Sequence, residues 1–291
     1  MSLDAFLLSV RQCNTPAAER PRLVPFAVAG EHVGLLLPAF AARLLAFRDV
    51  FVRVGDEVHL CPSLATPDSR TAAVGRCLRS LHGEGLFTGW REELLAVSAS
   101  WSSPPLFLLE RAAVPSFGVR AFGVHVNCYV QLESGELEMW VARRSRTKQT
   151  WPGALDHMVA GGQPHGISPR DNVIKEAGEE AGVPEDLARR AIPAGVVSYE
   201  VIVPEGLKRD VLFCYDLELP PCFKPVAADG EVEEFFLMPV SKVVELVAST
   251  EEYKPNCRLV CMDFFCRHGI VTPEMPGYLA LQQALRTGEL S

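Results

Sequence analysis

The chain has 291 residues, 48% of them hydrophobic and 22% charged, a composition that excludes disordered and coiled-coil proteins. Its formal net charge is −8 and no basic stripe is visible, which argues against a nucleic-acid partner, because such proteins need clustered cations to neutralise phosphates. No apolar run reaches the roughly 18 residues of a membrane-spanning helix, so no membrane partner is expected.

The start of the chain lacks the basic and apolar regions of a secretory signal. The nine cysteines show no tight framework spacing, which is typical of reduced thiols. These two features predict a cytoplasmic protein. The densest cysteine group has no Cys-x-x-Cys pair and lies in a segment with the pattern of a buried strand, so no zinc site is expected there. It comprises Cys257, Cys261, Cys266 and His268.

The length favours two domains. In chain order, the first third predicts a small α+β domain with helices at Leu3–Arg11, 39–47 and 69–81, a strand at 32–37, and a proline-containing segment at 102–117 that ends helix-like. We place the boundary near residue 118, giving an accessory domain over residues 1–118 and a second domain over residues 119–291. The first domain shows no catalytic spacing.

The second domain alternates strand-like and helical segments, which predicts a mixed α/β or α+β sandwich. The expected strands are 124–132, 137–143, 158–160, 195–203, 211–219 and 233–238, and the expected helices are 169–181, 240–248 and 277–286.

The helix at 169–181 has well-defined ends and follows a glycine-rich turn. Ser168 is a good N-cap, Pro169 suits the first helical position, and Gly182 suits the position after the last turn. On this helix Glu176, Glu179 and Glu180 have i, i+3 and i+4 spacing, so their carboxylates share one face.

Like charges at this spacing repel, whereas converging hard oxygen ligands are what Mg²⁺ or Mn²⁺ prefers. A solvated acidic face is the alternative. Gly161-Gly162 before the helix and Ala-Gly-Val after its glutamates favour the metal site, because this combination is far less frequent by chance.

The stretch resembles the Nudix box, in which a glycine is followed at fixed distances by a glutamate and then by a glutamate-rich helix. Gly161 takes the place of the first glycine, and Glu176 to Val183 match the closing part. Two positions depart from the pattern: Ile167 replaces the first glutamate and Lys175 replaces the arginine. These two groups usually pair to brace the loop against the helix, and their joint replacement is consistent with removal of the whole pair rather than of one buried partner.

The resemblance continues over nearly the whole chain. It includes Gly89–Glu93, Gly123–Asn127, Trp140–Ser145, Trp151–Gly161, Asp216–Pro220, Asp229–Phe235 and Lys254–Asn256. Together these segments resemble the Nudix branch related to thiamine pyrophosphokinase, which has an extra N-terminal domain. The resemblance implies a Nudix α/β/α sandwich with a mixed sheet. It also implies hydrolysis of oxo- or oxythiamine diphosphate to the monophosphate and phosphate.

The resemblance also implies residue roles. Glu176, Glu179, Glu180 and the Gly161 carbonyl are expected to bind Mg²⁺, with Mn²⁺ as an alternative, which neutralises the diphosphate and activates water. Glu180, Glu231 or Glu233 is the expected general base, although the last two also fit a charged strand edge. Arg144 and Lys148 are expected to bind the terminal phosphate, while His125 and Trp151 either line the organic-group pocket or belong to the core.

Three alternatives remain open at this point. A nucleotide-sugar or dinucleotide pyrophosphatase would use the same chemistry with another pocket. A non-catalytic Nudix-fold binding module fits the departures at Ile167 and Lys175 but not the three retained glutamates. An isopentenyl diphosphate isomerase would need a catalytic cysteine such as Cys128 together with clustered histidines, which are sparse here. A small organic diphosphate is the expected partner, and both a monomer and a homodimer are compatible with the sequence.

Overall fold

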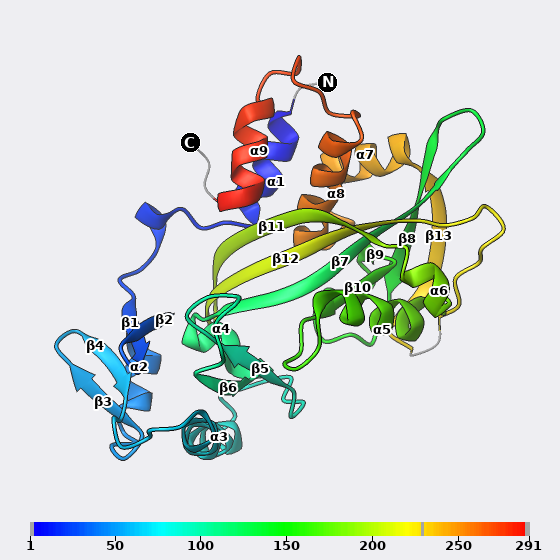
Figure 1. Cartoon of the computed structure of the whole chain (residues 1–291). Helices are drawn as coiled ribbons and strands as arrows, with labels where there is room; N and C mark the ends of the chain where they lie inside the picture. Colours follow the sequence, from blue (N-terminus) through cyan, green and yellow to red (C-terminus); the bar gives the residue numbers. More distant parts are fainter. Residues whose placement is uncertain (1–2, 228–229, 289–291) are drawn as a thin grey trace.

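The computed structural model describes residues 3–227 and 230–288, and its main sheets form two parts that the chain connects between α1 and β1 and between α4 and β7 (Figure 1). In the first part, a four-stranded sheet of order β2-β1-β4-β3 packs with helices, and a separate two-stranded hairpin lies beside it. Its elements are β1 (Val24–Val28), β2 (Glu31–Leu36), α2 (Pro38–Leu44), β3 (Phe51–Val54), β4 (Glu57–Leu60), α3 (Pro67–Gly83), β5 (Leu94–Val97), β6 (Phe107–Glu110) and α4 (Val114–Phe117), with short 3-10 turns at Ala17–Glu19 and Arg111–Ala113.

The second part is built on one sheet of order β11-β12-β7-β8-β13. β7 (Arg120–Gln131) pairs in parallel with β12 (Gly206–Glu218), and the other neighbours in this order are antiparallel, so the sheet is mixed. Short strands extend two of these pairings: β10 (Val159–Gly162) pairs with β7, and β9 (Leu155–His157) pairs with β8 (Leu137–Arg144). The remaining strands are β11 (Ile192–Val203) and β13 (Val232–Pro239).

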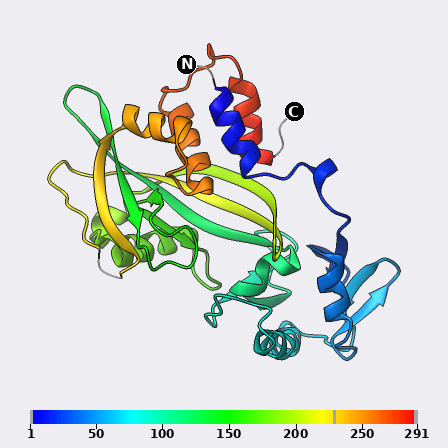
Figure 2. The same ribbon diagram turned by 180° about the vertical axis from the view of Figure 1, so that it is seen from behind.

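Helices cover both faces of this sheet (Figures 1 and 2). α5 (Pro169–Ala181) and α6 (Glu185–Ala188) lie on one face, over a core that includes Val124, Val126 and Val173. On the other face lie α7 (Val240–Ser249), α8 (Pro255–Arg267) and α9 (Tyr278–Thr287). The predicted mixed α/β sandwich with a smaller N-terminal α+β domain is therefore confirmed.

The first helix, α1 (Asp4–Gln12), packs with the second part of the chain although it belongs to the first third of the sequence. Leu3, Phe6 and Val10 are buried in the same core cluster as residues of α7, α8 and α9, and both views show α1 beside α9 (Figures 1 and 2). The backbone N–H of Thr15 also donates to the carbonyl of Glu200 on β11. A division at residues 118 and 119 therefore separates α1 from the core it completes.

The cysteine-rich segment forms the helix α8, so the expectation of a buried strand was wrong. Residues 257 to 266 of this helix are all buried, and a segment that is buried on every side shows no amphipathic period. Two other features indicate a helix: its length of 13 residues and Pro255 at the first helical position. The strands β1, β3, β4, β5 and β6 were not predicted, because each has only four or five residues.

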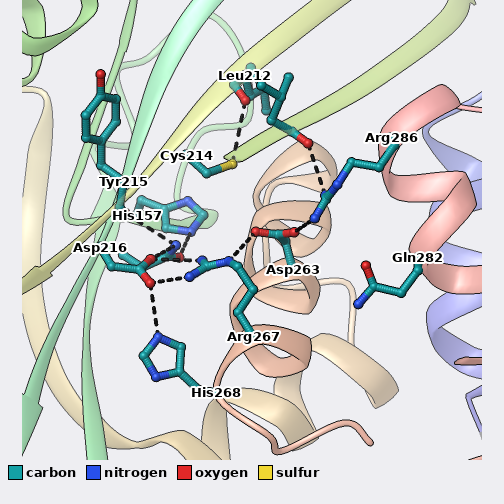
Figure 3. Close-up of polar contacts among 12 residues, drawn as sticks. His157, Leu212, Cys214, Tyr215, Asp216, Asp263, Arg267, His268, Gln282 and Arg286 are labelled. Atoms are coloured by element: carbon teal, nitrogen blue, oxygen red, sulfur yellow. Dashed lines mark hydrogen bonds and ion pairs between the residues drawn. The ribbon is translucent and has the colours of Figure 1, made fainter. Parts of the chain in front are cut away.

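An ion-pair network attaches α8 and α9 to β12 (Figure 3). The guanidinium of Arg267 contacts Asp216 on β12 and Asp263 one turn earlier on its own helix, and Arg286 of α9 also pairs with Asp263. Asp263 is fully buried, so the two arginines supply the positive charge that its carboxylate needs. Within the described residues, no helix combines the length and apolarity needed to cross a membrane.

Candidate active site

Helix α5 begins and ends as its sequence predicts. The hydroxyl of Ser168 accepts the backbone N–H of Asp171 at 3.1 Å, Pro169 opens the helix, and Gly182 ends it with a φ of +63°. That left-handed conformation favours glycine. The three glutamates are thereby held on a regular helix at the expected spacing.

The glycine-rich turn lies directly against the carboxylate of Glu176. A β-carbon on residue 161 would stand 2.4 Å from Cδ of Glu176, a distance that atoms cannot adopt. The pKa of Glu176 is raised, mainly by burial. The neighbouring Lys175 lowers this pKa, whereas the nearby carboxylates of Glu179 and Glu231 raise it further. The half-buried carboxylate of Glu176 and the backbone carbonyl of Gly161 can therefore offer oxygen atoms to one cation.

The other two glutamates have different partners. Glu180 accepts the backbone N–H of Ala160 at 2.8 Å, which joins the helix to β10. Glu179 is largely exposed and receives Lys175 Nζ at 2.8 Å, while the same amino group lies 3.1 Å from Glu176. The Lys175 ammonium thus stands between two carboxylates, where it supplies the positive charge that a divalent ion would supply.

The loop before α5 is braced without the glutamate–arginine pair of the Nudix pattern. Gln163 Nε2 donates to the carbonyl of Ile167 at 2.8 Å, and Asn172 Nδ2 donates to the carbonyl of Gly162 at 2.9 Å. Side-chain amides therefore hold the turn to the helix. This replacement explains how Ile167 and Lys175 occur without loss of the loop.

A small cavity beside the glutamates collects charged groups from β8, β9, α5 and the residue before β13. It is lined by Ala142, Arg144, Asp156, His157, Ala160, Glu180, Glu231 and Val232. Arg144 donates to Asp156 at 2.7 Å, and Lys148 Nζ lies 2.6 Å from Glu231. Burial raises the pKa of Glu231, but the hydrogen bond from Lys148 and the positive charges of Lys148, Arg91 and Arg144 together outweigh this effect and leave the pKa below its usual value.

The remaining predicted residues lie elsewhere. Glu233 is half exposed and pairs with Arg146 at 3.6 Å. His125 is buried inside the domain, where it faces His157, and Trp151 is exposed on the loop after β8 with a φ of +52°. The structure thus brings Arg144, Lys148 and Glu231 to the glutamates but does not bring Glu233, His125 or Trp151 there. Asp229 of the quoted motif lies outside the described residues.

A second, larger pocket opens on the other side of the glycine-rich loop. Its walls come from the first domain, from the start of β7 and from that loop: Leu95, Ala96, Ser98, Ser100, Trp101, Ser103, Pro105, Arg120, Ala121, Phe122 and Gln163–Ile167. Trp101 has its ring centroid 4.6 Å from that of Phe122 and 4.7 Å from that of Phe213. No pattern in the sequence indicates this pocket, because Trp101 lies in an irregular segment far from the box.

A mixed-sheet sandwich in which a glycine-rich turn enters a helix with Glu176, Glu179 and Glu180 on one face defines a Nudix domain. The comparisons agree. The profile of the NUDIX domain matches residues 121–257, and the profile of a domain of unknown function, DUF4743, matches residues 5–121.

Two relatives from Arabidopsis thaliana match almost the entire chain. Nudix hydrolase 24, chloroplastic, is 44% identical over 99% of this chain and 80% of its own length, and Nudix hydrolase 20, chloroplastic, is 43% identical over 99% and 79%. Among solved structures, DR0079 from Deinococcus radiodurans has a TM-score of 0.44 and 20% identity over 60% of this chain and 99% of its own. The chain belongs to the Nudix hydrolase family.

Membership makes the chain a hydrolase of phosphorus-containing anhydrides, in a family that generally uses divalent metal ions. The expected cytoplasmic location is contradicted, because both Arabidopsis relatives are named as chloroplastic. The reduced state of the cysteines did not distinguish these compartments.

Proposed function

We propose that this chain is a Mg²⁺-dependent diphosphatase in which Glu176, Glu179, Glu180 and the Gly161 carbonyl bind the metal. The observation that carries the proposal is the contact between Gly161 and the Glu176 carboxylate, beside a cavity that Glu180 and Glu231 also line. All the donors are oxygen atoms, which suits Mg²⁺ and admits Mn²⁺. When bound, the metal would neutralise diphosphate charge and polarise the phosphorus–oxygen bonds.

The protein's own groups then have defined tasks. Arg144, in the wall of the cavity, and Lys148, beside Glu231, would attract the terminal phosphate. Glu231 would take a proton from the attacking water, because its lowered pKa keeps it ionised at neutral pH and it lies at the cavity. Glu233 is a weaker candidate for this base, since its partner is the exposed Arg146.

The aromatic pocket favours a substrate with a planar ring system. Trp101 and Phe122 present ring surfaces next to the loop that ends at α5, and Arg120 and His165 add polar groups to the same wall. Offset stacking on such rings stabilises a bound heteroaromatic group. Thiamine-type diphosphates, above all oxothiamine and oxythiamine diphosphate, combine such rings with a diphosphate and are our first candidates.

A substrate panel tests this assignment. Release of phosphate and of monophosphates would be followed with Mg²⁺ for thiamine, oxothiamine and oxythiamine diphosphates, ADP-ribose, NADH and isopentenyl diphosphate. We expect turnover of the thiamine-type compounds. Turnover of ADP-ribose or NADH alone would retain the diphosphatase chemistry and refute the substrate, and no turnover of any compound by the folded protein would favour a binding module.

A further inference from the structure

Four side chains with metal-binding atoms meet where β7 and β9 lie close to the first turn of α8. His125 lies on β7, Asp156 and His157 lie on β9, and Cys257 lies in the first turn of α8. All four are buried, and one ligand atom from each lies within 4.8 Å of those from the others. The group differs from the three glutamates, which offer only oxygen atoms, although Asp156 and His157 line the same cavity as Glu180.

The hydrogen bonds around His157 direct its lone pair into the group. Asn127 Nδ2 donates to Asp216 Oδ1 at 3.0 Å, so Asn127 turns its oxygen toward His157 Nε2 at 3.1 Å. His157 therefore donates through Nε2, and its Nδ1 lone pair faces His125 Nδ1 at 3.2 Å. Histidines that bind metals are commonly fixed in this way through their second nitrogen.

The carboxylate of Asp156 is oriented in a similar manner. Arg144 and Lys254 donate to its Oδ2 at 2.7 and 3.2 Å, which leaves Oδ1 turned toward Cys257 Sγ at 2.7 Å. Burial and the adjacent carboxylate raise the pKa of Cys257, so a metal ion that binds this sulfur would displace its proton.

We propose that His125, Asp156, His157 and Cys257 form a structural Zn²⁺ site. Two imidazoles, one thiolate and one carboxylate are the ligand types that tetrahedral Zn²⁺ accepts, and its bond lengths place neighbouring ligand atoms about 3.3–3.8 Å apart. One carboxylate and one thiolate also supply two negative charges to the ion, while Arg144 and Lys254 stay bonded to the second oxygen of Asp156. Four protein ligands in a buried position form a closed site, which is typical of a structural rather than a catalytic metal.

Such a site would fasten α8 to the sheet under the diphosphate cavity. Asp156 and His157 line that cavity on one side and face Cys257 on the other. The alternative is a metal-free hydrogen-bonded network, in which Arg144 and Lys254 supply the positive charge near Asp156. The two arrangements differ in metal content and in the state of the Cys257 sulfur.

The experiment is metal analysis of the full-length protein after expression with added zinc and dialysis, followed by replacement with Co²⁺. We expect one Zn²⁺ per chain and, with Co²⁺, a thiolate-to-cobalt charge-transfer band with intense tetrahedral absorption. Both should disappear in Cys257→Ser and persist in Cys266→Ser, a buried cysteine of the same helix outside the group. Removing Zn²⁺ from the wild-type protein should lower Tm by several degrees.

If the folded wild-type protein binds neither Zn²⁺ after dialysis nor Co²⁺ after reconstitution, the site is refuted. This outcome does not depend on any variant. Persistence of the charge-transfer band in Cys257→Ser would refute the assigned ligand. Glu179→Gln should retain the cobalt band because its carboxylate belongs to the other metal site. Loss of hydrolysis in that variant with the band intact separates this proposal from the proposed function.

Discussion

The backbone of Gly161 lies so close to the carboxylate of Glu176 that no side chain fits at position 161. The nearest atom to a β-carbon at position 161 would be Cδ of Glu176 at 2.4 Å, followed by Oε1 at 2.6 Å. These two residues come from β10 and α5, so the contact fixes the turn relative to the helix. The neighbouring Gly162 is different, since a β-carbon there would have its nearest contact at an ordinary 3.7 Å.

Gly161→Ala should therefore abolish most activity while the protein stays folded. The added methyl group displaces the end of a flexible side chain, not backbone, and so moves the Glu176 carboxylate out of position. We expect kcat/KM to fall about a hundredfold, as for loss of a metal ligand. Gly162→Ala is the matched control and should keep activity within a few fold. Equal losses in both variants would contradict the role of the contact.

Glu179→Gln should lower kcat by a factor of about 100 or more, because a metal ligand acts mainly in the transition state. The exposed position of this residue predicts little change in Tm. Glu185→Gln, which changes an exposed glutamate of the neighbouring helix α6, serves as the control. A Glu179→Gln enzyme with wild-type kcat at saturating Mg²⁺ would remove Glu179 from the metal site.

The two candidate bases on and before β13 can be separated by parallel substitutions. Glu231→Gln should reduce kcat by about 10²–10⁴-fold, as expected for loss of a general base, and should remove the acidic limb of the pH–rate profile. Glu233→Gln should leave both unchanged because its partner is the exposed Arg146. The reverse pattern would assign the base to Glu233.

Trp101→Ala should raise KM for a thiamine-type diphosphate more than it lowers kcat. Loss of one stacking ring corresponds to about 0.5–1.5 kcal/mol, or about 2- to 13-fold in KM. Trp101→Phe should restore most of the affinity, which a merely structural defect would not predict. An unchanged KM in Trp101→Ala would place the organic group outside the pocket between the two domains.

The network around Asp216 predicts loss of stability in acid. Burial alone raises the pKa of Asp216, but the bonds from His268, Arg267 and Asn127 outweigh this effect and leave the pKa below its usual value. A carboxyl group whose pKa is lower in the folded state contributes stability above its unfolded pKa of about 3.9 and loses that contribution as the pH falls through the folded value.

The free energy of unfolding, from denaturant titrations between pH 7 and pH 3, should therefore fall at the acidic end. Asp216→Asn should be less stable than the wild type by about 3 kcal/mol at pH 7, since it leaves Arg267 with one carboxylate fewer, and should show a shallower acid slope. Identical slopes in the two proteins would show that Asp216 does not titrate in this range.

The sequence predicted α5 to the residue because its end signals are local: a serine cap, a proline and a left-handed glycine. It failed for α8, where ten consecutive buried residues leave no amphipathic period to detect. The placement of α1 against α8 and α9 depends on contacts between the two ends of the chain, which no local pattern encodes.

The candidate site also has one part that local sequence predicts and another that depends on the fold. Glu176, Glu179 and Glu180 are close in sequence, so helical spacing alone brings them together. Trp101 comes near the glycine-rich loop only through the packing of the first domain, and the group formed by His125, Asp156, His157 and Cys257 depends on two strands and a helix. Of the two positions expected for His125, its burial agrees with the core and not with the organic-group pocket.

The most direct test of the account is phosphate release from oxothiamine diphosphate by the purified chain, titrated with Mg²⁺ after removal of metal with EDTA. We predict that activity is absent without added metal, rises with Mg²⁺ to saturation, and yields the monophosphate and phosphate in equal amounts. Hydrolysis at the same rate without Mg²⁺, by protein shown to be metal-free, would contradict the assignment of the three glutamates as the metal site.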